Sequence, residues 1–209
     1  MLWFGLLVSI MLVPKNVPSE WMAYECLNWP DAYPYAPEVS FRVWHDSKCF
    51  HIEFKVREES TKAEQSELGA EVYQDSCVEC FIQPKPEDPH YYNFEWNAAG
   101  HLAMACRTGR SDPEPAPLDV ISSVKAEPSL GSEPFSEKAL DKPWTLHVAI
   151  PITALFNAGL EKWDGLKCRM NFFKCGDKLK TPHYLTWAPI DTPKPDYHRP
   201  EFFKVVQFE

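Results

Sequence analysis

The fold is decided by two neighbouring stretches, SCVECFIQ at Ser76–Gln83 and YYNFEWN at Tyr91–Asn97. Strict alternation of inward and outward positions is typical of antiparallel strands that bury one face. The turn-prone segment Pro84–His90 between the two stretches predicts that they form a hairpin. Apolar residues fill every second position, which predicts the following inward set: Val78, Cys80 and Ile82 in the first strand, and Tyr92, Phe94 and Trp96 in the second.

The opposite face of this hairpin carries polar side chains. Cys77, Glu79 and Phe81 alternate with the apolar set on the first strand, and the second strand offers amides and a further carboxylate: Asn93, Glu95 and Asn97. Carboxylates and amides fixed on a rigid sheet, with aromatic rings nearby, suit the hydroxyl groups of a sugar. We therefore expect this face to bind a polyhydroxylated ligand.

Similar short patterns continue along the chain. They predict eight further strands: Glu38–Trp44, Phe50–Val56, His101–Arg107, Val120–Ala126, Trp144–Ile150, Leu166–Cys175, His183–Ala188 and Phe202–Phe208. Arg57–Glu71 is charged and is interpreted as a solvated excursion. Many short strands separated by turn signals, with little helix, predict an all-β protein. We expect an antiparallel β-sandwich, immunoglobulin-like or jelly-roll-like, with long Pro-rich loops.

Composition limits the classes of function. The chain has 209 residues, 44% of them hydrophobic, which is enough for a core within one domain. Its 20 Pro against 8 Gly indicate fixed loops between strands. The formal net charge is -9 and no Lys/Arg cluster is dense enough to track phosphates, so nucleic acid is a poor partner. A neutral sugar suits this charge balance better.

The first 13 residues, Met1–Val13, form a separate apolar segment ahead of a single domain at residues 14–209. The segment is too short for an ordinary membrane span. One interpretation is a secretory signal without the usual basic start, which would place the protein in the periplasm or outside the cell. The other is an extra start before a first strand near Met11–Val13, compatible with the cytoplasm. The sequence leaves both open, as it does the oligomeric state.

Seven cysteines leave at least one unpaired. Cys77 and Cys80 form a C-x-x-C, but residues three apart on a strand point to opposite faces. We therefore expect neither a shared metal nor a redox pair from this motif. The remaining cysteines are scattered, and the prediction is inert, mostly buried thiols.

Three functions compete for the polar face. The first is non-catalytic sugar binding, with aromatic rings at Tyr73, Tyr197 and His198 flanking Glu79. The second is glycoside hydrolysis by Glu79 with Glu95 or Asp75, since that reaction uses two carboxyl groups; Glu95 is otherwise an ordinary solvent-facing residue. The third is haem binding, which would need a Met or His pair converging on one pocket. Among the seven histidines, His183 and His198 are the ones expected to meet a ligand.

Several stretches in the same order resemble carbohydrate-binding module family 9, and most closely its family 9-like branch of Bacteroidetes-type bacteria. The resemblance covers most of the chain from about Asn28 and is carried by the following stretches: NWP at Asn28–Pro30, YAPEVSF at Tyr35–Phe41, YQDSCVECFI at Tyr73–Ile82, YYNFEWNAAG at Tyr91–Gly100, NFFKCGD at Asn171–Asp177, and HYLTWAPIDTPKPDYHRPEFF at His183–Phe203.

The resemblance implies a binding module of the kind attached to xylanases and other glycoside hydrolases, with no catalytic residue of its own. Two Trp of the family clamp the terminal sugar of a glucan or xylan, and an acid on the signature strand holds its hydroxyls. Here the acid matches Glu79, whereas the clamp positions fall at Tyr73 and near Tyr197 or His198. Family members can also bind structural calcium, although no acidic loop here matches. The expected partner is an oligo- or polysaccharide bound by six residues: Tyr73, Glu79, Asn93, Tyr197, His198 and Arg199.

Overall fold

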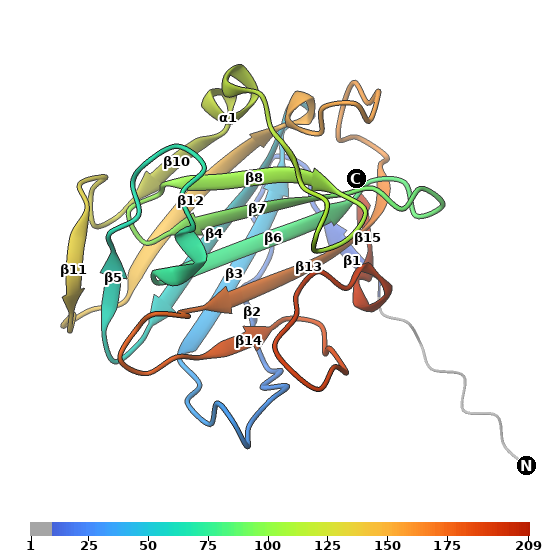
Figure 1. The fold of residues 1–209 in the computed structure, drawn as a ribbon. Helices are drawn as coiled ribbons and strands as arrows, with labels where there is room; N and C mark the ends of the chain where they lie inside the picture. The colour runs from blue at the N-terminus through green and yellow to red at the C-terminus, as the bar shows by residue number, and fades with distance from the viewer. Residues whose placement is uncertain (1–9) are drawn as a thin grey trace, which may run out of the picture.

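Two β-sheets pack face to face in the computed structural model, which describes residues 10–209 (Figure 1). The larger sheet follows the order β1 (Met11–Val13), β15 (Lys204–Phe208), β13 (Lys167–Cys175), β6 (Cys77–Gln83), β7 (Tyr91–Asn97), β8 (Leu102–Arg107) and β9 (Glu114–Pro115), and β14 (Tyr184–Thr186) also pairs with β13. The second sheet follows the order β10 (Lys125–Pro128), β12 (Trp144–Pro151), β4 (Cys49–Arg57), β3 (Glu38–His45) and β2 (Met22–Ala23).

Smaller elements complete the structure. They are the two-stranded sheet of β5 (Thr61–Ala63) and β11 (Phe135–Lys138), the helix α1 (Leu118–Ser123), and the single 3-10 turns η1 (Val72–Gln74), η2 (Ile152–Ala154) and η3 (Pro200–Phe202). The all-β sandwich predicted from the sequence is confirmed. Among the described residues, every strand pair is antiparallel except β1 with β15, which run parallel.

The core lies between the two sheets, and its members on β6 and β7 are those predicted from the alternation. Val78, Cys80 and Ile82 are fully buried there, and Phe94 and Trp96 stack with an interplanar angle of 14°. The expected hairpin has the register Glu79 opposite Glu95, and β8 continues it as a meander. The sequence periodicity therefore places the alternating side chains of β6 and β7 on the correct faces.

One predicted strand is wrong over most of its length. Residues 120–123 of the expected strand Val120–Ala126 belong to helix α1, and its last two residues begin strand β10 beside β12. Val120 and Ile121 are adjacent in sequence and both pack against the core from this helix, which an alternating strand does not allow. Residues 1–9 of the apolar N-terminal segment lie outside the described residues, and Met11–Val13 forms the edge strand β1.

Arg57–Glu71 is the solvated excursion that its charge predicts only in its second half, where Glu64, residues 66–69 and Glu71 are exposed. Thr61 and Lys62 are buried on β5, and Glu58 is only 9% exposed. Their charges are accommodated by pairing, because Glu58 meets Lys174 and Lys62 lies 3.6 Å from Asp75. Buried charges are tolerated when they are paired in this way.

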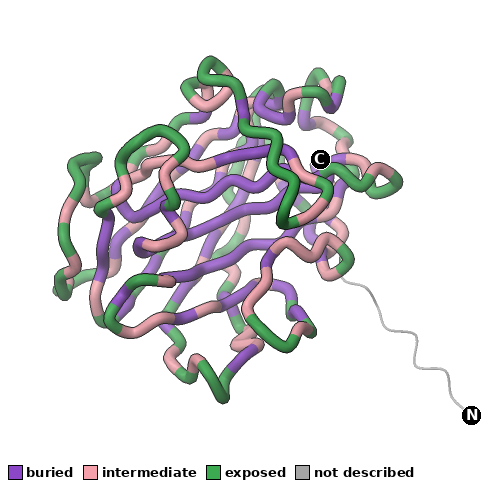
Figure 2. Tube along the Cα trace, in the orientation of Figure 1, coloured by how far each residue is buried: buried purple, intermediate pink, exposed green. Residues whose placement is uncertain are grey.

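The outer face of the larger sheet is also covered, which the alternation does not indicate. All seven residues of β6 and all seven of β7 are buried, as the purple strands of Figure 2 show. The side chains above this face form a second apolar cluster, separate from the core and built largely of aromatic rings: Trp29, Val72, Cys77, Phe81, Tyr91, Phe173, Cys175, Ile190, Tyr197 and Phe203. The covering loops leave one hollow between them.

Candidate functional site

The hollow is a pocket of about 540 Å³ on the outer face of the larger sheet. Its floor consists of strand residues from β13, β6, β7 and β8, namely Cys175, Glu79, Glu95 and Arg107. Its walls come from the turn η1, the loop after β8 and the Pro-rich loop that precedes η3. A volume of this size is within the range of small-molecule sites.

Two carboxyl groups face each other at the floor. Glu79 on β6 is the direct cross-strand partner of Glu95 on β7, and the two residues are 2% and 7% exposed. Burial, and then the negative charge of Glu95, hold the pKa of Glu79 well above its usual range. Burial likewise raises the pKa of Glu95 to about 7. The pair therefore retains a proton near neutral pH, so it can donate as well as accept hydrogen bonds.

Glu95 is held by a chain of polar contacts along the sheet. The Asn93 amide donates a hydrogen bond to Glu95 Oε1 at 2.8 Å, and Arg107 Nε donates to Asn93 Oδ1 at 2.8 Å. The hydrogen bond from Asn93 and the positive charge of Arg107 favour the ionised form of Glu95, and they lower its pKa against the effect of burial. Glu95 is thus a buried pocket residue whose carboxyl is held in place by Asn93. An ordinary solvent-facing residue was expected at this position from the sequence.

Glu79 is bordered by two thiols. Cys175 Sγ lies 3.1 Å and Cys77 Sγ 3.8 Å from Glu79 Oε1, and both thiols are free. Burial raises the pKa of Cys77 to about 12 and also raises that of Cys175. The thiols therefore donate weak hydrogen bonds that keep the Glu79 carboxyl oriented.

Tyr73 lies on the turn η1 and lines the pocket beside Glu71. Its hydroxyl donates to Glu71 Oε1 at 2.7 Å. Burial, together with this hydrogen bond, raises the pKa of Tyr73 to about 12. The ring is half-buried, so part of it remains available at the pocket wall.

Tyr197 and His198 form part of the opposite loop, and both line the pocket. Tyr197 is largely committed to the protein, because its ring stacks on Phe173 at 4.3 Å and its hydroxyl donates to the Lys174 carbonyl at 2.9 Å. His198 packs on Phe81, and its Nδ1 lies 2.9 Å from the Tyr91 hydroxyl. Burial, and then Arg107, lower the pKa of His198 to about 3, which keeps the ring neutral.

The remaining expected residues lie outside the pocket lining. Asn93 is 2% exposed and acts behind Glu95. Arg199 is 39% exposed and pairs with Glu201 at 2.5 Å. His183 is fully buried under the site. The lining residues that were not predicted from the sequence include Tyr33, Arg107, Asp177 and Tyr184. Arg107 could have been found, since period two on His101–Arg107 places it on the same face as Glu95.

Asp75, one of the two proposed partners of Glu79 in hydrolysis, and the residue pair needed for haem are both absent from the described residues of the pocket lining. The Asp75 carboxylate accepts backbone hydrogen bonds from Glu64 and Gln65 at 2.9 and 2.8 Å and is fully buried outside the pocket. Asp75 therefore holds the chain segment that directly follows β5, and it is not the partner of Glu79. Among the described lining residues His198 is the single histidine and there is no Met, so the pair that haem binding needs is not brought together.

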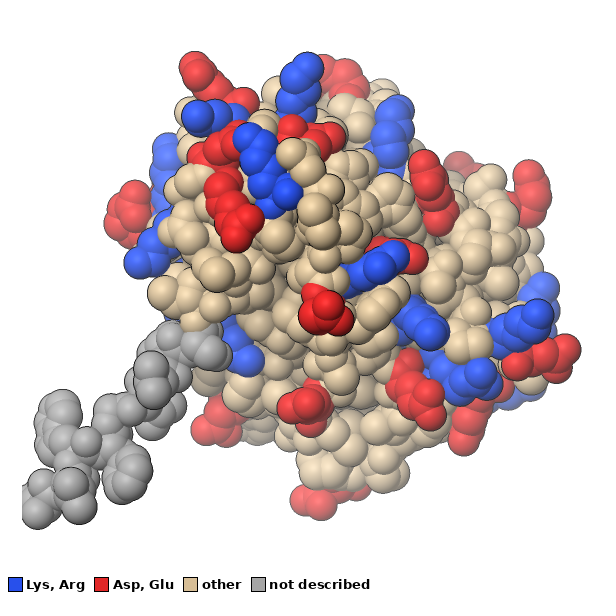
Figure 3. All heavy atoms as spheres, turned by 180° about the vertical axis from the view of Figure 1, so that it is seen from behind, with Lys and Arg blue, Asp and Glu red and all other residues tan. Residues whose placement is uncertain are grey.

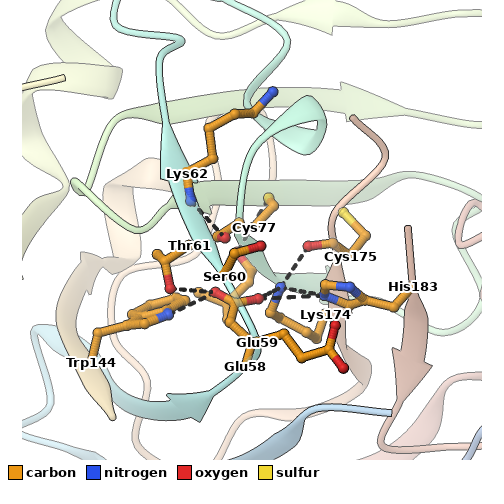
Figure 4. A network of polar contacts seen from close by, with 12 residues as sticks. Glu58, Glu59, Ser60, Thr61, Lys62, Cys77, Trp144, Lys174, Cys175 and His183 are labelled. Atoms are coloured by element: carbon orange, nitrogen blue, oxygen red, sulfur yellow. Dashed lines mark hydrogen bonds and ion pairs between the residues drawn. The ribbon is translucent and has the colours of Figure 1, made fainter. Parts of the chain in front are cut away.

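A buried ion pair supports the floor from the core side (Figure 4). Lys174 Nζ lies 2.8 Å from Glu58 Oε2 and 2.7 Å from His183 Nε2, with all three side chains fully buried. Burial, and then the positive charge of Lys174, lower the pKa of His183 to about 2. The neutral ring therefore accepts a hydrogen bond from Lys174 Nζ. Trp144 Nε1 donates to the other Glu58 oxygen at 2.8 Å. This network fixes β13 directly beside Cys175.

The charges on the far side of the molecule are mixed. Lys and Arg are interspersed with Asp and Glu over the face in Figure 3, with no continuous basic area in that view. In the part of the chain that the structure describes, no helix has the length and apolar character needed to cross a membrane.

Possible metal ligands come together at one place among the described residues. A single group of three or more His, Cys, Asp or Glu side chains has its ligand atoms close together, and it consists of Cys77, Glu79 and Cys175. Calcium takes six to eight oxygen ligands. Two of these three donors are sulfur, so this group does not fit calcium.

The sandwich and its polar, partly aromatic pocket define a ligand-binding β-sandwich module. The chain belongs to carbohydrate-binding family 9, whose model matches residues 8–208. Carbohydrate binding is accordingly the class of function of this protein.

Solved structures share this fold. A protein of Bacteroides uniformis ATCC 8492 proposed to bind carbohydrate is 36% identical, with a TM-score of 0.90 over 95% of this chain and 98% of that one. A family 9 module of Caldicellulosiruptor kristjanssonii in complex with glucose is 10% identical, with a TM-score of 0.60 over 96% of each chain. The same module in complex with cellotriose is 11% identical, with a TM-score of 0.60 over 96% of this chain and 94% of that one. No curated protein matches the chain.

Proposed function

We propose that the pocket above Glu79 and Glu95 binds a β-linked glycan of the cellulose or xylan type, without cleaving it. The observation that carries this proposal is the pair of buried, directly opposed carboxyl groups at the floor of a pocket of about 540 Å³. A partly protonated carboxyl pair both donates to and accepts from sugar hydroxyls. The glucose and cellotriose complexes of the Caldicellulosiruptor module support a β-linked glucan as the first ligand to test.

Each proposed contact follows from the position of the side chain. Arg107 at the floor and Arg110 in the adjoining loop supply donors for sugar oxygens. Tyr73 provides a ring against the apolar C–H face of a sugar, and His198 provides the facing wall. Tyr33 and Tyr184 extend that wall as an edge-to-face pair with centroids 4.7 Å apart. Asn93 acts through Glu95, and Tyr197 acts by positioning the loop.

Hydrolysis by Glu79 and Glu95 is the second candidate, since both carboxyl groups have raised pKa values in a pocket. In glycosidases, however, the two carboxyl groups flank the scissile bond. Glu79 and Glu95 are adjacent on one floor, where opposite Cβ atoms lie about 5 Å apart. Both carboxyls thus approach a bound sugar from the same side, which favours binding over cleavage.

Isothermal titration calorimetry of the full chain tests the proposal. Cellotriose and xylotriose are compared with maltotriose, an α-linked control. We expect heat with at least one β-linked sugar, and at least tenfold weaker binding in Glu79→Ala. Glu201→Gln, which changes an exposed carboxyl outside the pocket, is the matched control and should bind like the parent. The proposal is wrong if neither β-linked sugar binds, and reducing-sugar release that is lost in Glu79→Gln would favour hydrolysis.

A further inference from the structure

Two free cysteines stand side by side under the pocket. Cys77 on β6 is the direct cross-strand partner of Cys175 on β13, although the two are 98 positions apart in the sequence. Both side chains belong to the cluster on the outer face of the sheet, whereas Cys80 lies in the core. The partner of Cys77 is therefore Cys175 and not the second cysteine of its C-x-x-C. Figure 4 shows both residues at the end of their strands next to Lys174.

Glu79 adds an oxygen donor to the two sulfurs. Its Oε1 lies 3.1 Å from Cys175 Sγ and 3.8 Å from Cys77 Sγ, and all three ligand atoms lie within 4.8 Å of one another. All three side chains are buried. No other group of this kind occurs among residues 10–209, so the arrangement is not a general feature of this Cys- and acid-containing sheet.

These separations match the ligand geometry of tetrahedral zinc. Zinc binds sulfur at about 2.3 Å and carboxylate oxygen at about 2.0–2.2 Å, which puts neighbouring ligand atoms about 3.5–3.8 Å apart. Of the two distances to Glu79 Oε1, that of Cys77 Sγ (3.8 Å) lies at the upper end of this range and that of Cys175 Sγ (3.1 Å) lies below it. Side-chain rotations alone would bring the three donors around one ion, because the strands already hold their Cα atoms in register.

We propose that Cys77, Cys175 and Glu79 form a binding site for a thiophilic divalent cation of the zinc type, with its fourth position open to the pocket. Two sulfur donors select zinc-like ions over magnesium and calcium, which prefer oxygen. An ion reaches the site from the pocket, because Cys175 and Glu79 line it. Asp177 lines the same pocket and adds a negative charge at the entrance.

Binding forms two metal–sulfur bonds and one metal–oxygen bond. The two thiols and the protonated carboxyl release their protons to solvent through the pocket, and no electron is transferred. The inference does not depend on the proposed glycan, and its test contains no sugar. Failure of one proposal is therefore distinguishable from failure of the other.

Titration with Co²⁺ alone, in the full chain purified under a phosphine reductant, tests the site. Sulfur ligation gives a thiolate-to-cobalt charge-transfer band in the near ultraviolet, which we expect to saturate at one equivalent and to disappear on addition of Zn²⁺. Cys77→Ser and Cys175→Ser should each abolish the band or weaken binding at least tenfold. Cys80→Ala is the matched control, since Cys80 is equally buried on the same strand but faces the core; it should retain the band.

A second measurement uses only the parent protein and so does not depend on the folding of any variant. Zn²⁺ should slow alkylation of Cys77 and Cys175 at least tenfold, read residue by residue by mass spectrometry, and leave the rate at half-exposed Cys49 unchanged. The proposal is overturned if the folded parent gives no charge-transfer band. It is equally overturned if the band survives in the Cys77→Ser/Cys175→Ser double variant, or if neither thiol is protected.

Discussion

Glu79 and Glu95 are direct partners on antiparallel strands β6 and β7, and both are less than a tenth exposed. Two carboxyl groups at this spacing and burial cannot both ionise without a large electrostatic cost. Their pKa values are accordingly raised, and that of Glu95 reaches about 7. The relationship makes the floor of the pocket sensitive to pH near neutrality.

The first prediction concerns the pH dependence of stability. The pKa of Glu95 is higher in the folded state, about 7, than its ordinary value of 4.5. Its contribution to the free energy of unfolding is therefore full below about pH 4.5 and is lost as the pH rises to about 7. Over this window we expect the parent to lose on the order of 1–3 kcal/mol relative to Glu95→Gln.

Urea denaturation at a series of pH values measures this difference. Glu133→Gln, at an exposed carboxyl, is the control and should follow the parent across the window. Parallel stability profiles of the parent and Glu95→Gln would contradict a raised pKa at Glu95.

Asn93 is predicted to tune the carboxyl that it contacts. Its amide donates to Glu95 Oε1, and this hydrogen bond lowers the pKa of Glu95. Asn93→Ala should therefore move the Glu95 titration above pH 7, and it should weaken sugar binding through misplacement of the carboxyl. Carbon-13 NMR of labelled Glu side chains follows the titration directly. An unchanged or lowered pKa would rule out this role.

Tyr73 is predicted to act as a stacking wall. Removal of the ring in Tyr73→Ala should weaken binding of a β-linked trisaccharide by about tenfold, since one aromatic contact contributes on the order of 1 kcal/mol. Tyr73→Trp offers a larger ring and should bind more tightly than the parent. Calorimetry compares the three proteins. Equal affinities would place the sugar away from η1.

Glu58 and Lys174 are predicted to depend on each other for their contribution to stability, so that removal of one partner alone costs more than removal of both charges. Lys174→Met leaves the buried Glu58 carboxylate without its cation, which should cost about 3–5 kcal/mol of unfolding free energy. The double variant Glu58→Gln/Lys174→Met should recover part of that loss, because no unpaired charge remains. Urea denaturation of the single and double variants measures the coupling. Strictly additive losses would show that the two residues do not depend on each other.

The fold could be predicted because apolar and polar residues alternate along its strands. Alternation along Ser76–Gln83 and Tyr91–Asn97 assigned each side chain to a face, and the turn between them fixed their pairing. The helix α1 could not be found in this way, since a short apolar run such as Val120–Ile121 does not by itself distinguish a helix from a strand. Packing against the core decided that segment.

The site was predictable only in part. Glu79, Tyr73 and His198 were expected from local patterns, and all three line the pocket. Asp177, Tyr33 and Tyr184 join them from distant segments, and nothing in their local sequence indicates the pocket. Likewise, the charges of Glu58 and Lys62 predict a solvated segment, whereas pairing with Lys174 and Asp75 allows them to be buried.

The sequence by itself therefore determined the sandwich, the hairpin and the face that carries Glu79, because a strand's side chains alternate whatever surrounds it. Only the tertiary structure decided that this face is covered, that Cys77 meets Cys175, and that Glu95 belongs to the pocket. These features depend on strand order and on loops folding back over the sheet. Burial then sets the pKa values, since removal of water from two opposed carboxyl groups penalises their charged forms.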